Sequence, residues 1–226
     1  MSEQSEQATH IAQLEADNQR LRRLLDQSNA PGELRHRLRS TAAMLRMIIR
    51  RSAETKRDLE IFVGHVEDRL DALMRAQSAA DENGSVEIYA LLTDELLHYG
   101  ATESPNLTIS GPHVHLQPRA GQVFGLALHE LAINAVEHGL LGIGAGKLDI
   151  SWTVTGKNPE QTLVFTWRET GRTEPLKIGS PGFGTEVLTR LLEYEIEAQT
   201  DLAMDTQSVV CTIRFPLADR IGRVEN

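Results

Sequence analysis

LHELAINAVEHG, residues 128–139, has the spacing of a helix with two unlike faces. Glu130, Asn134 and His138 are four residues apart, so they fall along one face, while apolar side chains occupy the other. A carboxylate, an amide and an imidazole aligned in this way could hold a metal–phosphate group, because Mg²⁺ prefers oxygen ligands. Taken alone, the same spacing is more typical of a solvated polar face.

A second motif, SPGFGT at residues 180–185, stands immediately before a helical pattern. Gly182 and Gly184 would let the backbone approach phosphate groups closely, and a helix N-terminus offers free N–H groups. Short glycine loops are common, so this motif is weak evidence by itself.

A third motif, TWRETG at residues 166–171, ends a predicted strand. Glu169 could accept a hydrogen bond from an exocyclic amine such as that of adenine, and Gly171 would allow close approach. An acidic residue at a strand end is more often only a turn residue.

Upstream of these motifs, two helices are predicted over Glu33–Arg51 and Thr55–Ala80. Each carries an apolar stripe, formed in the first helix by Leu34, Leu38, Thr41, Leu45 and Ile48, and in the second by Leu59, Val63, Val66, Leu70 and Leu73. Such stripes suit an antiparallel helical hairpin, which would form a four-helix bundle if two chains paired.

Residues 11–25 carry a shorter pattern with Asn18 at an inward position. A single buried Asn often sets parallel two-stranded pairing, but two heptads equally fit an ordinary amphipathic helix.

The second half of the chain predicts an α+β sandwich, one sheet with helices on one face, behind a linker at residues 81–85. Helical periodicity covers residues 86–97, 118–141 and 185–196. Strand patterns cover residues 106–110, 148–154, 163–167 and 209–215.

Composition narrows the class of protein. The net charge of −9 argues against nucleic acid as the main partner, because phosphate backbones need clustered cations. No run approaches the length of a membrane span, and the polar N-terminus is not a secretory signal, so we expect a cytoplasmic protein. The one cysteine, Cys211, excludes an intrachain disulfide and is expected in the core.

The motifs, taken in order, resemble the HWE histidine kinases, bacterial two-component kinases named for a His in the Asn-box and a Trp-x-Glu motif. The matching residues are His36 in the hairpin, His129-Glu130 with Asn134, Trp167-Arg168-Glu169, and Gly182-Phe183-Gly184-Thr185. The resemblance covers roughly residues 33 to 217. It implies the GHKL-type ATPase fold shared with gyrase and heat-shock ATPases, and the lack of a Walker A motif agrees with this.

The resemblance also implies the roles of these residues. Asn134 would ligate Mg²⁺, Glu130 would support the metal or act as a base, and His138 would lie near the phosphates of ATP. Glu169, with Gly171 beside it, would recognise adenine. The phosphate-binding loop would comprise Gly182, Phe183, Gly184 and Thr185. The role of His129 stays open and could be structural.

His36 resembles the phosphoacceptor of the family, with an arginine directly after it. It lies off the apolar stripe, the surrounding arginines can offset phosphoryl charge, and Glu33 could polarise the imidazole. His65 in the second hairpin helix is the alternative acceptor.

The chain departs from the family at two places. Arg172-Thr173 stands where the family has Gly-Pro, and Ser40 stands where it has Asn. Residues 1–32 are too few to bury a sensor core, so a separate upstream sensor protein is an expected partner.

The prediction is therefore a two-component histidine kinase with three parts: a tail and short helix at 1–32, a phosphoacceptor hairpin at 33–84, and an ATP-binding domain at 85–220. With Mg²⁺, ATP would phosphorylate His36, and the receiver domain of a response regulator would take the phosphoryl group. A homodimer is expected. The alternatives are a phosphotransfer module that docks response regulators with an impaired nucleotide site, and a serine kinase with the same ATPase fold.

Overall fold

The computed structural model describes residues 13–20, 32–53, 59–137, 141, 146–157, 160–171 and 182–225. The chain divides into two compact units, Met1–Asp71 and Ala72–Asn226, and the division falls inside helix α3 (Leu59–Asn83). The predicted functional boundaries after residues 32 and 84 are a separate question and stay predictions.

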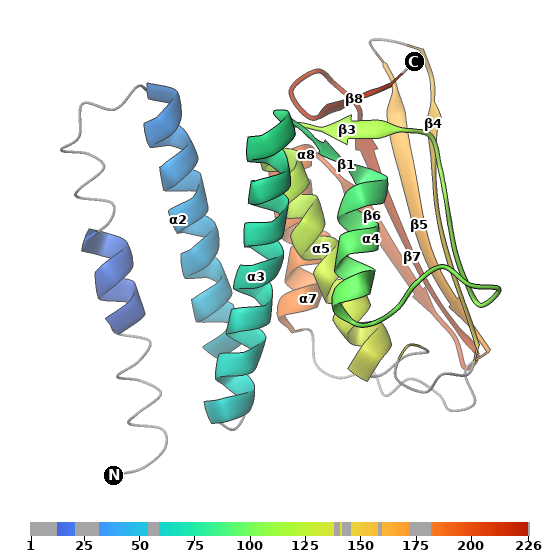
Figure 1. Ribbon diagram of the computed structural model, residues 1–226, viewed down its shortest axis with the longest axis horizontal. Coiled ribbons are helices and arrows are strands. Elements are labelled where there is room, and N and C mark those ends of the chain that lie inside the picture. Colours follow the sequence, from blue (N-terminus) through green and yellow to red (C-terminus); the bar gives the residue numbers. More distant parts are fainter. Residues whose placement is uncertain are drawn as a thin grey trace. The chain divides into compact units, whose positions relative to one another are not determined.

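The first unit is helical (Figure 1). Residues 13–20 form a helix, α2 spans Gly32–Ala53, and α3 begins at Leu59, which confirms both predicted hairpin helices. Asn18 is buried, and its Nδ2 donates a hydrogen bond to the Ala42 carbonyl at 3.0 Å. Within this chain Asn18 therefore serves the packing of an amphipathic helix on α2.

Burial within the first unit corrects the predicted stripe of α2. Ala42, Met44 and Ile49 are buried, whereas Leu38 is 36% exposed and Leu45 is half-buried. The helix at residues 13–20 contacts α2 at Ala42, so the buried face of α2 is wider than contact with a single helix would require. Leu38 lies one turn before Ala42 on the same side of the helix and is beyond this burial.

In the second unit, the main sheet has five strands in the order β2-β4-β5-β7-β6. Its strands are β2 (Leu107–Ser110), β4 (Lys147–Thr155), β5 (Thr162–Thr170), β7 (Ser208–Pro216) and β6 (Gln199–Met204). β2 is parallel to β4, and the other neighbours are antiparallel. The four predicted strands are thus confirmed, and β6 was not predicted.

A smaller sheet in the order β1-β3-β8 joins Val86–Glu87, Val114–Leu116 and Gly222–Val224. The predicted linker at residues 81–85 is largely wrong, because α3 continues to Asn83 and turns only at Gly84, which has φ +70°. The predicted helix at 86–97 is wrong at its start, since its first two residues pair with β3.

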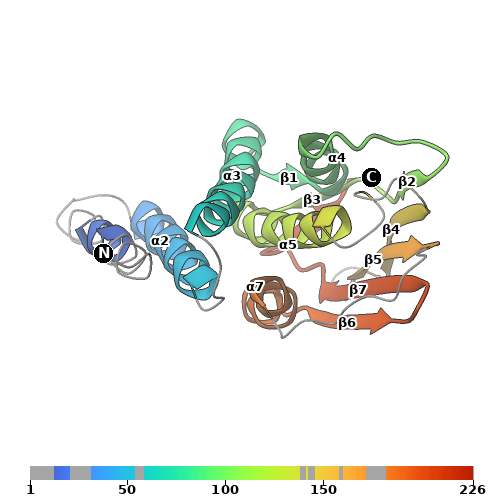
Figure 2. The same cartoon turned by 90° about the horizontal axis from the view of Figure 1, so that it is seen from below.

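Helices cover one face of the five-stranded sheet (Figures 1 and 2). They are α4 (Ile88–His98), α5 (Pro118–Glu137), and a continuous helical run made of α7 (Phe183–Glu186), the π-helical η1 (Val187–Leu191) and α8 (Leu192–Ile196). This arrangement confirms the predicted α+β sandwich.

Helix α5 lies at the centre of this layer and is buried on nearly all sides, which explains its apolar composition. The Phe124 ring meets Phe165 of β5 and Phe215 of β7 edge-on, with ring centroids 5.2 and 5.7 Å away. These contacts set the position of α5 over the sheet.

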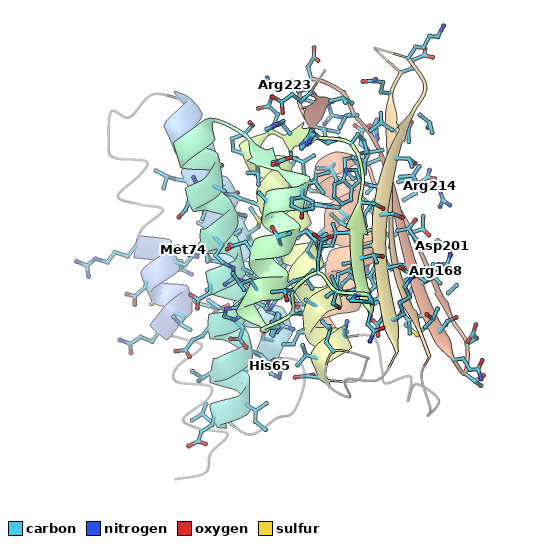
Figure 3. The ribbon with its side chains drawn as sticks, turned by 45° about the vertical axis from the view of Figure 1, so that its right-hand side comes forward. His65, Met74, Arg168, Asp201, Arg214 and Arg223 are labelled. Carbon is cyan, nitrogen blue, oxygen red and sulfur yellow. The ribbon has the colours of Figure 1, made fainter. Side chains whose placement is uncertain are left out.

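The opposite face of the sheet carries charge. Arg168, Asp201 and Arg214 point away from the helices there (Figure 3). Among the described residues, no helix combines the length and apolarity needed to cross a membrane.

Candidate functional site

The last turns of α5 carry the predicted acidic and amide side chains. Glu130 is 2% exposed and faces the interior, whereas Asn134, one turn later, is exposed. A single helix face therefore runs from a buried carboxylate to a solvent-facing amide. His138 lies outside the described residues.

The glycine loop meets this helix directly. A Cβ built at Gly184 would lie 2.8 Å from Oε2 of Glu130, closer than side chains normally approach. Glycine fits here because the Glu130 carboxylate fills the space beside the start of α7, and a larger residue would displace that carboxylate. The structure brings together two motifs separated by more than fifty residues of sequence.

The other members of the loop take different positions. A Cβ at Gly182 would meet nothing within 4 Å, and Thr185 is exposed, so both are open to a ligand. Phe183 is 6% exposed, so its side chain anchors the loop in the core and only its backbone can face a ligand. Gly182 precedes the first helical residue, which leaves the N–H groups of the first turn of the α7–η1–α8 run pointing toward the loop.

At the end of β5, Trp167 Nε1 donates a hydrogen bond to Glu169 Oε1 at 3.1 Å. Residues two apart on a strand share a face, and both side chains are buried on the side that the helices cover. Leu148 and Val209 are the register partners of Glu169 on the neighbouring strands, so the carboxylate has apolar neighbours on both sides.

Gly171 ends this strand in a conformation that only glycine adopts readily. Its φ is +92°, and a Cβ there would lie 3.0 Å from the Cα of Gly146. The close neighbour at this strand end is thus the Gly146 backbone, and the approach of a base to Gly171 stays a prediction. Arg172 and Thr173, where the sequence departs from the family, lie outside the described residues.

His129 is fully buried and belongs to a network. Its Nδ1 lies 2.9 Å from Oε1 of Glu95 and 3.2 Å from the Tyr99 hydroxyl, and Arg75 Nη2 donates to Oε2 of Glu95 at 2.5 Å. Burial acts to raise the pKa of the Glu95 carboxyl, but hydrogen bonds and charges from His129 and Arg75 together hold that pKa below its ordinary value. The carboxylate is therefore ionised inside the helical layer.

Sequence reasoning missed Arg75 and Glu95. A signal existed, because Glu95 falls among Leu91, Leu92 and Leu96 on the buried face of α4. A charged residue at an apolar position of an amphipathic helix predicts a buried partner.

The proposed phosphoacceptor lies in the other unit. The backbone of His36 is helical, in the second turn of α2, and its side chain lies outside what the structure describes. The nearby Leu38 and Arg39 are exposed.

Comparison with known proteins indicates a family. Residues 33–113 match the family model described as HWE histidine kinase. The chain is 34% identical over 177 residues to blue-light-activated histidine kinase 1 of Erythrobacter litoralis, covering 74% of this chain and 47% of that protein. On these matches the chain is similar to the HWE histidine kinases.

The other relatives agree. A blue-light-activated histidine kinase of Rhizobium johnstonii is 26% identical over 188 residues, covering 82% of this chain and 52% of that protein. The chain thus spans about half the length of the curated relatives it matches.

Solved structures show the same fold. The histidine kinase domain of an Erythrobacter litoralis blue-light-activated kinase superposes with a TM-score of 0.53 at 14% identity, covering 94% of this chain and 96% of that one. A longer structure of such a kinase gives 0.54 at 16% identity, covering 86% and 64%. The second unit has the GHKL-type fold of histidine kinase catalytic domains, as the sequence predicted.

Proposed function

We propose that this chain is an ATP-dependent protein-histidine kinase of a two-component system. The bond between the γ-phosphorus of ATP and its bridging oxygen breaks, a bond from that phosphorus to a ring nitrogen of His36 forms, ADP leaves, and the imidazole releases its proton. An aspartate on the receiver domain of a response regulator then takes the phosphoryl group.

The observation that carries the proposal is the contact of Gly184 with Glu130. It sets a glycine loop, a helix N-terminus and the acid–amide face of α5 side by side, which is the combination that phosphate recognition with a divalent cation requires. None of the three motifs indicates a site for phosphate and a divalent cation by itself.

The residues present fit Mg²⁺ and ATP. Asn134 offers an exposed amide oxygen, Glu130 a carboxylate one turn away, and Gly182 open space above the helix start. Bound Mg²⁺ would supply positive charge that offsets the charge of the phosphates. No group of three or more His, Cys, Asp or Glu among the described residues could hold a metal, so phosphate oxygens and water would complete its shell.

The base would lie at the end of β5. The Glu169 carboxylate is fixed by Trp167 and flanked by Leu148 and Val209, so it can accept a hydrogen bond from the exocyclic amine of adenine between apolar walls. Gly171 and Gly146, whose backbones lie close together, are at this end of the strand.

The test uses the pure chain. Calorimetry should show adenine nucleotide binding that depends on Mg²⁺, and incubation with labelled ATP should leave an acid-labile, alkali-stable label on the protein. Absence of binding at millimolar nucleotide would reject the kinase and favour the phosphotransfer module. An acid-stable label would favour the serine kinase.

We also propose that the hairpin pairs with a second copy. In α2, Leu38 is exposed and Leu45 half-buried, and in the first unit's part of α3, Val63 and Leu70 are half-buried, so apolar surface remains for a partner helix pair. Sedimentation should show a dimer, and the double change Leu45→Glu with Leu70→Glu should dissociate it, because charges would be buried between the chains.

Ala43→Glu, at an exposed position of the same helix, is the matched control and should leave the dimer intact. Circular dichroism of each variant separates dissociation from unfolding. A monomeric wild type at high concentration would refute the shared bundle and leave the kinase proposal standing. The cytoplasmic location and the separate sensor partner stay predictions.

A further inference from the structure

Three side chains from three successive helices meet inside the second unit. Glu95 of α4 uses one carboxylate oxygen for Arg75 of α3 and the other for His129 of α5, at 2.5 and 2.9 Å. Glu95 and His129 are almost without exposure, and the Arg75 side chain is 22% exposed. The buried Glu95 carboxylate thus has a cationic partner on α3, which continues from the hairpin. Its second partner is on α5, which carries residues of the proposed nucleotide site.

The hydrogen-bond pattern fixes the His129 ring. An ionised Glu95 requires the proton on Nδ1, and Nε2 has no partner in the part of the chain that the structure describes. Glu95 therefore holds this ring in one orientation.

The C-terminal half of α3 packs against α5 close to this network. A Cβ at Gly125 would lie 3.2 Å from the Ala76 Cβ, so the two helices approach closely there. The Gln122 amide donates to the side-chain oxygen of Gln77. Arg75 stands beside these contacts, so its position follows any rotation or sliding of α3 against α5.

His129 directly precedes Glu130, whose carboxylate packs on Gly184, and Asn134 lies one turn further on. A helix moves as a stiff element, so a rotation of α5 at His129 displaces both groups.

We propose that Glu95 is a positioning residue that couples α3 to the nucleotide site, a proposal that rests on the proposed kinase function. The contact of Glu95 with His129 holds α5 in one rotation about its axis. The contact of Glu95 with Arg75 makes this rotation depend on the position of α3. Movement of α3 that withdraws Arg75 leaves a buried carboxylate with one strong partner fewer. Glu130 and Asn134 then lose their fixed place relative to the glycine loop, and phosphoryl transfer slows.

The neighbouring Asp94 supplies a matched control. It also faces Arg75, at 3.9 Å, but its side chain is 58% exposed. Asp94→Asn removes the same charge beside the same arginine without touching His129. Arg75→Met and Arg75→Lys form a second pair, because only the lysine keeps a cation for Glu95.

The first experiment needs no nucleotide. Hydrogen exchange of the full chain should become at least about fivefold faster at amides of residues 126–137 in Glu95→Gln and Arg75→Met, and change less than about twofold in Asp94→Asn and Arg75→Lys. Amides of β7 should exchange as in the wild type in all four variants. Unchanged exchange in α5 of Glu95→Gln would overturn the proposal. Faster exchange in β7 as well would also overturn it, because the variant would then have lost stability throughout the unit.

The second experiment separates positioning from binding. At saturating ATP and Mg²⁺, Glu95→Gln should label about tenfold more slowly, while its dissociation constant for ADP stays within about threefold, because the base is held at β5. Parallel loss of rate and ADP affinity, or a rate within twofold of the wild type, would contradict the proposal. If the wild type neither binds nor labels, the kinase function fails, and hydrogen exchange still decides whether Glu95 positions α5.

Discussion

His36→Ala should abolish phosphoryl labelling of the chain and leave ATP binding unchanged. An alanine has no nitrogen to accept the phosphoryl group, so the loss should be complete within detection. The proposed nucleotide site would draw on α5, β5 and the start of α7, whose described residues all lie in the unit that does not contain His36. Acid-labile label from radioactive ATP measures the first effect, and calorimetry with Mg²⁺ measures the second.

His65→Ala is the control for this result, because it removes a half-buried imidazole from the other hairpin helix. It should label like the wild type. Equal labelling of His36→Ala and the wild type would refute the assignment and direct attention to His65 or His98. Loss of ATP binding in His36→Ala would show instead that the change disturbs the nucleotide site.

The sequence predicted the sheet where alternation was strong. Strands β4, β5 and β7 each place apolar residues at every second position, which their buried faces require. β6 was missed because five of its six residues are exposed, so it has no apolar alternation to detect. β3 and β8 have three residues each, too few to show a period.

At the site, sequence spacing alone predicts that some pairs of residues lie together, but it does not predict this for others. The four-residue step from Glu130 to Asn134 and the two-residue step from Trp167 to Glu169 each fix a shared face, so both were predictable. The fit of Gly184 against Glu130 depends on how two distant segments pack, and only the structure shows it.

The buried network of Arg75, Glu95 and His129 was harder to predict. Its members are far apart in sequence, and charged side chains of these types are usually found on the surface. Arg75 and Glu95 are separated by twenty residues, and His129 by thirty-four more. Burial of Glu95 on the apolar face of α4 was the local signal, but the identity of its partners required the packing of three helices. Long-range pairing of charges follows from topology, which periodicity does not encode.

Asn134→Ala should remove most of the Mg²⁺ dependence of ATP binding and abolish labelling. The Asn134 side chain is exposed while its neighbours Leu131 and Ala135 are buried, so the change removes a ligand oxygen without opening the core. Loss of a hydrogen bond or ligand contact to a charged group typically costs about 1.5–3 kcal/mol, or roughly ten- to a hundredfold in affinity. Calorimetry with and without Mg²⁺ measures the change in binding.

Glu169→Ala should give the contrasting result, because we propose that this carboxylate recognises the base and not the phosphates. It should reduce the preference for ATP over GTP and retain the Mg²⁺ dependence, since Asn134 and Glu130 stand on another element. Circular dichroism is needed for this variant, because Glu169 is buried and its loss leaves the Trp167 N–H without this acceptor. If Asn134→Ala instead changed base preference, or bound and labelled with full Mg²⁺ dependence, the assignment of the metal-facing side of α5 would be wrong.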